Sequence, residues 1–353
     1  MAYTTIDDPS AYFQAKTYTG TNNSNALTND GNSDLQPDFI WIKRRNYNNG
    51  HQLLDSTRGV DKILGSELSS AETTLANRLS SFDTDGFTVE SSSGAFNASG
   101  EPFVAWQWKA NGGTTSTDTT SSITSTVQVN SDAGFSVVTY TGDGTTTGGF
   151  GHGLGVAPKV VFVKRRNAAA NWCVYHESIG AGFYLQLDTT AAQQSGPWQN
   201  LAPSSTTVIV YGGGLVNGNG DTYVAYCFAE KQGYSKFGKY VGNGSTNGTF
   251  VYTGFKPAFV LVKNYSNSGY DWRLVDSARN KFNLTDLLLM PNLTSAEFDG
   301  STHALNIGID FLSNGFKCRS GQGAFNLNGG SYIYMAFAEN PFVTSTGIPT
   351  TAR

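Results

Sequence analysis

Charged residues are scarce in this chain of 353 residues. Asp, Glu, Lys and Arg together make up 14% of it, whereas an ordinary globular protein has about 25%. The 23 basic and 27 acidic side chains leave a formal net charge of −4, without the basic surplus that sequence-independent nucleic-acid binding requires. No run of 18 apolar residues is present, so the sequence predicts no transmembrane helix. We therefore expect neither a nucleic-acid partner nor membrane insertion.

Cysteine and histidine are also rare. Cys173, Cys227 and Cys318 lie far apart and form no CxxC pair, and we interpret them as small buried side chains of a protein made in a reducing cytoplasm. The opening residues, MAYTTIDDPS, lack the basic and apolar regions of a secretory signal. The four histidines show no metal-ligand spacing, and we expect no metal and no cofactor. They are His51, His152, His176 and His303.

The residues that take the place of charge are typical of β-structure. The chain has 41 glycines, 13% aromatic residues and many Ser, Thr and Asn side chains, which predicts an all-β protein with many turns. Trp106 and Trp108 have the same parity in one expected strand, so that strand has a strongly aromatic face. We interpret this face as core, with a sugar-binding platform as the alternative.

One set of sequence features occurs three times in the same order, which indicates three tandem copies of one unit. An apolar strand runs from a proline to a lysine at Pro37–Lys43, Pro158–Lys164 and Pro257–Lys263. A Tyr-x-Gly turn precedes it at Tyr18–Gly20, Tyr140–Gly142 and Tyr240–Gly242. A second strand follows, which we align as Gln52–Asp55, Trp172–Tyr175 and Trp272–Val275. An aromatic strand ends each unit at Phe103–Trp108, Tyr223–Phe228 and Tyr332–Phe337.

These spacings predict three tandem β-sandwich domains of jelly-roll or lectin-like type, with a closed barrel as the alternative. The expected domains are residues 1–110, 134–233 and 234–342. Residues 111–133 are rich in Ser, Thr and Gly and are predicted to be a linker. Residues 343–353 are predicted to be an exposed polar tail.

Several local patterns carry weaker predictions. Residues 69–82 match a short helix whose apolar face would be Ala71, Leu75, Leu79 and Phe82. Gly149–Gly155 lacks the Lys-Ser/Thr of a phosphate-binding loop and is interpreted as a flexible connection between strands. Two acidic clusters resemble calcium loops but lack ligands, so we interpret them as turns. They are Asp83, Asp85 and Glu90, and Asp30 and Asp34.

The most distinctive motif is Lys-Arg-Arg-Asn, which ends two of the three apolar strands. It stands in FIWIKRRN at 39–46 and VVFVKRRN at 160–167, whereas FVLVKNYS at 259–266 keeps only the lysine. One interpretation places the charges where a strand enters a hairpin, so that they prevent edge pairing. The other is contact with a neighbouring subunit or an acidic glycan. The candidate binding residues are Lys43, Arg44, Arg45, Lys164, Arg165 and Arg166.

The chain also resembles uncharacterised virion proteins of marine bacteriophages, of the tail-fibre-like or concanavalin-like-repeat kind. The resemblance covers almost the whole sequence and rests on phrases such as AYTTIDDPSAYFQAKTYTG, PDFIWIKRRN and YVAYCFAEKQGYSKFGKYVGNGS. It implies a structural protein of the tail or capsid surface that is made in the host bacterium and assembles into the virion. It also implies a homo-oligomer, for which we predict a trimer, and it carries over no catalytic residue.

Three functions follow from these patterns. The first is a tail-fibre or adhesin-like structural protein that contacts other virion proteins and a host-surface glycan. The second is a capsid decoration protein. The third is a tail hydrolase that degrades polysaccharide, for which two carboxylates in one cleft would be needed. Glu230 and Glu339 recur after two of the aromatic strands, but we interpret them as ion-pairing residues and expect no enzyme. A cellular lectin is a weaker fourth possibility.

Overall fold

The computed structural model describes residues 2–90, 94–302 and 306–350. Within these residues the regular structure consists of β-strands and three short 3₁₀ turns, and all named strand pairs are antiparallel. The all-β prediction is therefore confirmed. None of the described segments forms a helix long and apolar enough to cross a membrane. The 3₁₀ turns are η1 (Pro9–Ala11), η2 (Glu177–Ile179) and η3 (Gly300–Thr302).

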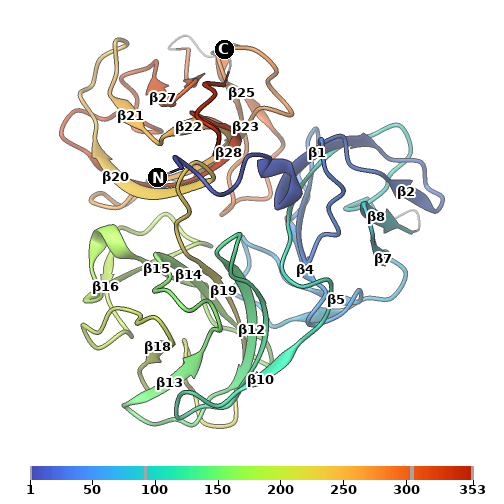
Figure 1. Cartoon of the computed structure of the whole chain (residues 1–353), viewed down its shortest axis with the longest axis vertical. Helices are drawn as coiled ribbons and strands as arrows, with labels where there is room; N and C mark the ends of the chain where they lie inside the picture. The colour runs from blue at the N-terminus through green and yellow to red at the C-terminus, as the bar shows by residue number, and fades with distance from the viewer. Residues whose placement is uncertain (1, 91–93, 303–305, 351–353) are drawn as a thin grey trace.

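The strands fall into three repeats of one pattern, drawn as three lobes around a common centre in Figure 1. We name them repeat 1 (residues 2–110), repeat 2 (111–233) and repeat 3 (234–342). In repeat 1 the main sheet has the order β1 (Phe13–Thr19), β9 (Pro102–Trp108), β3 (Phe39–Arg44) and β4 (Gln52–Asp55). Facing it are β2 (Asn25–Leu27), β8 (Gly86–Val89) and β7 (Leu79–Asp83), with the small pair β5 (Lys62–Ile63) and β6 (Thr73–Thr74).

Repeats 2 and 3 reproduce this main sheet. In repeat 2 the order is β10 (Ser116–Asp118), β11 (Ser125–Asn130), β12 (Phe135–Thr141), β19 (Thr222–Phe228), β14 (Val160–Arg165), β15 (Cys173–His176), β16 (Phe183–Gln186) and β17 (Gln194–Ser195), and the second sheet is β13 (Gly148–Gly151) with β18 (Thr207–Val210). In repeat 3 it is β20 (Ser235–Val241), β28 (Ser331–Pro341), β22 (Phe255–Asn264) and β23 (Arg273–Asp276). The facing strands are β21 (Phe250–Tyr252), β27 (Gly315–Cys318) and β26 (Ile309–Leu312), with β24 (Leu287–Leu288) and β25 (Phe298–Asp299).

Each main sheet is buried on both faces, which explains its continuous apolar strands. In β3, Ile40 and Ile42 point into a core between the two sheets of repeat 1. Phe39 and Trp41 point the other way, into a central core to which all three repeats contribute. Repeats 2 and 3 each have a separate core of their own as well. The described residues therefore form three sandwich cores and one shared core.

Three equivalent aromatic rings meet at the middle of the shared core. Trp108, Phe228 and Phe337 occupy equivalent positions in β9, β19 and β28. They pair with Phe39, Val160 and Phe259, each of which stands two residues after the proline of its apolar strand. Their ring centroids lie 5.6, 5.9 and 6.3 Å apart, in edge-to-face arrangements that favour aromatic pairing. Trp106 and Trp108 are buried, which confirms the core interpretation, but they face the other repeats and not the second sheet of their own sandwich.

Three sequence-based assignments are corrected by the fold. The expected linker 111–133 contains β10 and β11, and β11 pairs along its whole length with β12. The expected helix at 69–82 is instead an extended segment with β6 and the start of β7, because Leu79 alone of its four proposed apolar positions is fully buried. Residues 343–350 fold back, with a bridge between Val343 and Pro349 and a hydrogen bond from the Ser345 amide to Asp7.

In the sequence alignment the second strand of repeat 1 is one residue out of register with the second strands of repeats 2 and 3. β4, β15 and β23 pair Asp55, His176 and Asp276 with the equivalent residues Phe39, Val160 and Phe259. Counting back four residues, His51 and not Gln52 is the counterpart of Trp172 and Trp272. The sequence alignment sets the first residue of β4 beside two tryptophans that stand just before β15 and β23, whereas the shared feature is a ring just before each strand.

Candidate functional site

The lysines that end the three apolar strands are buried and bind backbone carbonyls. The Lys43 ammonium donates to the carbonyls of Arg44 and Tyr47, at 2.7 and 3.1 Å. Lys164 donates to Arg165, to Ala170 and, across to repeat 1, to Ser69. Burial lowers the pKa of both lysines to about 8. Their role is to satisfy the carbonyls of the loop that follows each strand.

Lys263, the counterpart in repeat 3, is held in the same way. It donates to Tyr270 and, across to repeat 2, to Thr190, and burial lowers its pKa to about 8 as well. The lysine recurs in all three repeats because all three hairpins need the same buried donor.

The first arginine of each Lys-Arg-Arg-Asn motif is paired inside its own repeat. Arg44 contacts Glu101 at 2.9 Å, and Arg165 contacts Asp221 at 2.5 Å. Both acids stand just before the aromatic strand that lies beside the motif. Arg44 also lies over the ring of Tyr47, with its Cζ atom 4.6 Å from the centroid. These pairs tie the end of one strand to the start of its neighbour.

The second arginine of each motif joins two repeats. Arg45 of repeat 1 donates to both carboxylate oxygens of Glu297 in repeat 3, at 2.9 and 2.8 Å. Arg166 of repeat 2 does the same to Glu72 of repeat 1, at 2.9 and 3.0 Å. Such bidentate pairs give orientation as well as attraction. We call these two interfaces the 1–3 contact and the 1–2 contact.

Each of these glutamates is also held by a buried arginine. In the 1–2 contact Arg58 donates to Glu72 and to Asp55, and neither the Arg58 nor the Asp55 side chain has any exposed surface. Asp55 also accepts a hydrogen bond of 2.8 Å from the Tyr226 hydroxyl of repeat 2. Although burial works against ionisation of Glu72, the hydrogen bond from Arg166 and the charge of Arg58 lower its pKa.

The 1–3 contact repeats this network residue by residue. Arg279 donates to Asp276 and to Glu297, and the Trp106 indole of repeat 1 donates to Asp276 at 3.0 Å. Burial again opposes ionisation of Glu297, while the hydrogen bond from Arg45 and the charge of Arg279 lower its pKa. Two equivalent interfaces thus share one design of alternating charges.

The 2–3 contact keeps the backbone geometry without the charges. The backbone amide of Gln193 donates to the Tyr265 carbonyl at 2.9 Å. In the other two contacts the backbone amides of Glu72 and Glu297 donate in the same way to the carbonyls of Arg166 and Arg45. His176 stands where the other contacts have aspartate, and its Nε2 lies 3.2 Å from the Tyr334 carbonyl. The loss of the second arginine in repeat 3 therefore coincides with the loss of its glutamate partner and of the aspartate of the same network.

A ring from each repeat reaches a carbonyl of the next. Trp172 donates to Gly65 and Trp272 donates to Gln186, both at 2.9 Å. His51, their counterpart in repeat 1, has its Nε2 atom 3.1 Å from the Met290 carbonyl. These bonds run around the centre in one direction, which gives the molecule a threefold arrangement within a single chain.

The six predicted binding residues are thus all engaged inside the chain. The interpretation as strand-edge protection is wrong, because β3, β14 and β22 each lie between two partner strands. Contact of these residues with another subunit or a glycan stays a prediction. Sequence reasoning missed the partners Asp55, Arg58, Asp276 and Arg279, although Asp-Ser-x-Arg occurs at both places and could have revealed them.

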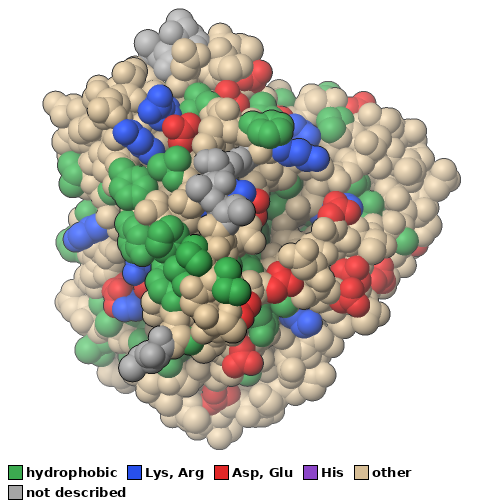
Figure 2. Space-filling model, turned by 45° about the horizontal axis from the view of Figure 1, so that its top comes forward, with side chains coloured by type: hydrophobic (Ala, Val, Ile, Leu, Met, Phe, Trp, Pro, Cys, Tyr) green, Lys and Arg blue, Asp and Glu red, His purple; other side chains and the backbone are tan. Residues whose placement is uncertain are grey.

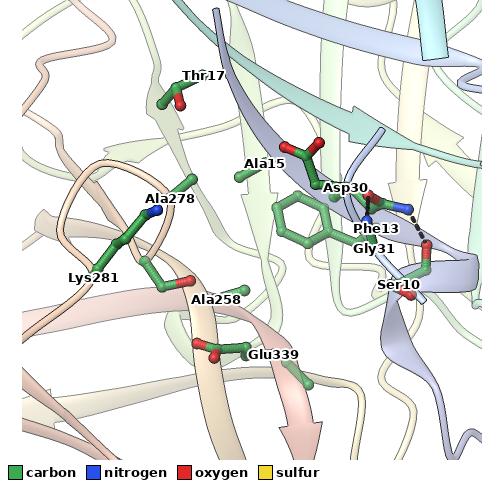
Figure 3. Close-up of a pocket in the computed structure, with 13 residues that line it drawn as sticks. Ser10, Phe13, Ala15, Thr17, Asp30, Gly31, Ala258, Ala278, Lys281 and Glu339 are labelled. Atoms are coloured by element: carbon green, nitrogen blue, oxygen red, sulfur yellow. Dashed lines mark hydrogen bonds between the residues drawn. The ribbon is translucent and has the colours of Figure 1, made fainter. Parts of the chain in front are cut away.

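An open groove lies beside the 1–3 contact, between β1 and repeat 3 (Figure 3). It has a volume of about 340 Å³. Ala15 and Thr17 of β1 line one wall, and Ala258, Ser277 and Ala278 of repeat 3 line the other. Charged groups at its rim are Asp30, Lys281 and Glu339.

The other sequence candidates have local partners. Glu230 and Glu339 form ion pairs with Lys236 and Lys256, as expected. Asp83 accepts hydrogen bonds from Ser81 and Thr88. Part of the glycine-rich stretch expected to be a loop is β13. The described residues hold no cluster of three or more His, Cys, Asp or Glu side chains placed for a metal.

The rare side chains are buried where the structure describes them. The three cysteines are buried and unpaired, which confirms that they are small buried side chains. His152 is also buried, and burial lowers its pKa. His303 lies outside the described residues.

Comparison with known proteins gives one match. A family model described as a domain of unknown function, DUF7483, matches residues 8–341, so a single model spans all three repeats. No curated protein and no solved structure matches the chain.

Proposed function

The chain belongs to the DUF7483 family, and we propose that it is a bacteriophage virion structural protein of the tail-fibre or adhesin-like kind. The observation that carries the proposal is the joining of three sandwiches through one aromatic core and a ring of hydrogen bonds between repeats. A block of this kind resists relative movement of its parts, because each repeat would have to expose large aromatic side chains to separate.

The surroundings of two buried histidines and the chemistry of one described face both favour assembly over catalysis. Two of the buried histidines, His51 and His176, accept hydrogen bonds at Nδ1 from Trp41 and from the Ser178 amide. These partners serve the fold and leave no acceptor for a nucleophile's proton. On the face shown in Figure 2 uncharged atoms dominate, and acidic and basic side chains are scattered. A surface of this kind contacts other subunits or glycans through hydrogen bonds with little dependence on salt.

Localisation on the particle is the direct test. Antibodies against the purified chain, with immunogold microscopy of virions from the source virus, should label the tail. Labelling over the capsid would support the decoration role instead, and absence of the chain from purified particles would defeat both. The chain should sediment as a trimer at micromolar concentration if the oligomer prediction is right.

Two further assays separate binding from hydrolysis. Saturating amounts of the purified chain should slow adsorption of the virus to its host if the protein contacts a host glycan. Incubation with host envelope polysaccharide should release no new reducing ends. Release of oligosaccharide would favour the hydrolase role.

A further inference from the structure

The three main sheets differ at the edge formed by their first strand. In repeat 2 that edge, on β12, is covered by β11. In repeat 3 the edge of β20 is partly satisfied within the chain, since the Phe237 amide donates to Glu230 of repeat 2 and the Val241 carbonyl accepts from Thr249. In repeat 1 the Thr19 carbonyl likewise accepts from Asn25, but the edge of β1 from Phe13 to Thr17 faces the groove. The same strand edge is thus covered by another strand in repeat 2, partly hydrogen-bonded in repeat 3 and open along most of its length in repeat 1.

The hydrogen-bonding register shows which groups of β1 face the groove. The Lys109 amide donates to the Tyr12 carbonyl and the Gly20 amide to the Glu101 carbonyl, so the even-numbered residues of β1 bond to β9. Antiparallel strands alternate, which turns the backbone groups of Phe13, Ala15 and Thr17 outward. Within the described part of the chain no group is paired with them.

The same register in repeat 2 shows what covers such an edge. The Ala229 amide donates to the Gly134 carbonyl, so the even-numbered residues of β12 bond to β19. The backbone groups of Phe135, Val137 and Thr139 therefore face β11. Phe13, Ala15 and Thr17 are their counterparts, since Phe13 and Phe135 pair with equivalent residues of β9 and β19.

The opposite wall of the groove is also matched. In repeat 2 Gln128 lies opposite Val137, and its side-chain amide donates to the hydroxyls of Ser56 and Thr57 of repeat 1. The counterparts of these two residues in repeat 3 are Ser277 and Ala278, which line the groove. Asp38, which binds the backbone of residues 110–113 beside β11, is replaced at the groove by Ala258.

We propose that the groove is a docking site for one extended segment of a partner polypeptide, which adds to β1 as a further strand in the way that β11 adds to β12. Strand addition supplies affinity through backbone hydrogen bonds and specificity through alternate side chains. A residue with a side-chain amide opposite Ala15 would reach Ser277. The acids Asp30 and Glu339 are already paired with Lys16 and Lys256, which leaves no free carboxylate at the rim for a basic segment, and the uncharged β11 is the pattern for the occupant.

The ends of the described chain do not occupy this place. Near the N-terminus, Tyr3 donates to the Gly254 carbonyl and Thr4 donates to the Gln232 carbonyl. Near the C-terminus, Ser345 bonds to Asp7. The described ends of the chain are therefore held away from the groove. The biological use of the site rests on the proposed assembly role, whereas strand addition to β1 can be tested without it.

The probe is a labelled peptide of the chain's own residues 122–132, SITSTVQVNSD, with binding to the full chain followed by fluorescence anisotropy. N-methylation at Thr126, Gln128 and Asn130, whose amides would face β1, should weaken binding at least tenfold. N-methylation at Val127 and Val129, which face away, should change it less than about threefold. Equal effects of the two sets, or no binding of the unmodified peptide, would overturn the proposal.

Variants of the protein locate the site. Ala278→Trp, which fills the groove, should abolish peptide binding, while Val156→Trp on an exposed position of repeat 2 should leave it unchanged. If Ala278→Trp binds the peptide normally, the groove is not the site. A concentration-dependent dimer of the wild type that Ala278→Trp dissociates would show that a second copy takes the edge, against a separate partner. Failure here with the chain still found on virions would leave the assembly role intact.

Discussion

The 1–2 and 1–3 contacts are built on charge, whereas the 2–3 contact is built on neutral groups in the same places. In the first two, an aspartate, a buried arginine, a glutamate and the second arginine of Lys-Arg-Arg-Asn form one chain of ion pairs. In the third, His176, Gln193 and Tyr265 replace three of these groups and keep the backbone hydrogen bond. A buried network is thus kept or lost as a whole, because one missing partner would leave an uncompensated charge.

Removing one buried charge should have the largest effect. Asp276→Ala leaves Arg279 without its closest partner and should cost about 3–5 kcal/mol of unfolding free energy. His176→Ala, at the equivalent place in the 2–3 contact, removes two hydrogen bonds between uncharged groups and should cost about 1–3 kcal/mol. Guanidinium unfolding of both variants measures the difference. Asp310→Ala, in a partly exposed pair with Arg319, is the control with a small expected cost, and equal costs at 276 and 176 would contradict the distinction.

Acid should weaken the 2–3 contact through its histidine. Burial lowers the pKa of His176 to about 4, and Nδ1 accepts a hydrogen bond from the Ser178 amide, so the folded ring resists protonation. The unfolded chain binds the proton first, near pH 6.5, so stability present above that pH is lost as the pH falls toward 4. The loss should approach about 1.4 kcal/mol per pH unit.

The variant His176→Asn isolates this effect. Its unfolding free energy should lack this acid-dependent loss, so the advantage of the wild type over it should shrink between pH 6.5 and 4. Urea unfolding of both proteins across this range measures it. Parallel pH profiles would show that His176 does not govern the acid response.

The smallest effect is the coupling across each contact. A double-mutant cycle of Arg166→Ala with Glu72→Gln should give a coupling of about 1 kcal/mol that weakens in 1 M salt, since the Arg166 side chain is partly exposed. The matching cycle of Tyr265→Ala with Gln193→Ala should give a coupling near zero at every salt concentration, because the 2–3 hydrogen bond joins backbone atoms. A salt-sensitive coupling in the second cycle would contradict the comparison.

Much of the fold could be read from local pattern. The apolar strands, the aromatic strands and the buried lysine recur in the sequence with nearly constant spacing, and each is set by contacts with its immediate neighbours. The expected helix and linker failed where local composition was ambiguous. Residues 69–82 contain enough apolar positions for a helix, and residues 127–130 alternate valine with polar side chains as a strand does, but only the partner strand decides either case.

The candidate site could be recognised but not interpreted. Lys-Arg-Arg-Asn stood out, yet its second arginine is explained by glutamates 252 and 94 residues away in the chain. No spacing in one repeat points to such a partner. The recurrence of Asp-Ser-x-Arg in repeats 1 and 3, together with the missing arginine of repeat 3, is the one sequence signal that links these positions.

The sequence by itself determined that the chain is all-β and that one unit occurs three times. It also showed that the lysine at the end of the apolar strand is present in all three units, whereas the two arginines after it are present in only two. Local periodicity and repetition suffice for these conclusions because they depend on each residue's nearest neighbours. Only the tertiary structure decided that the repeats share one core, that the arginines join them, and that β1 has an open edge. These features depend on which surfaces of distant segments face one another, and that choice is made by burial of the aromatic side chains at the centre.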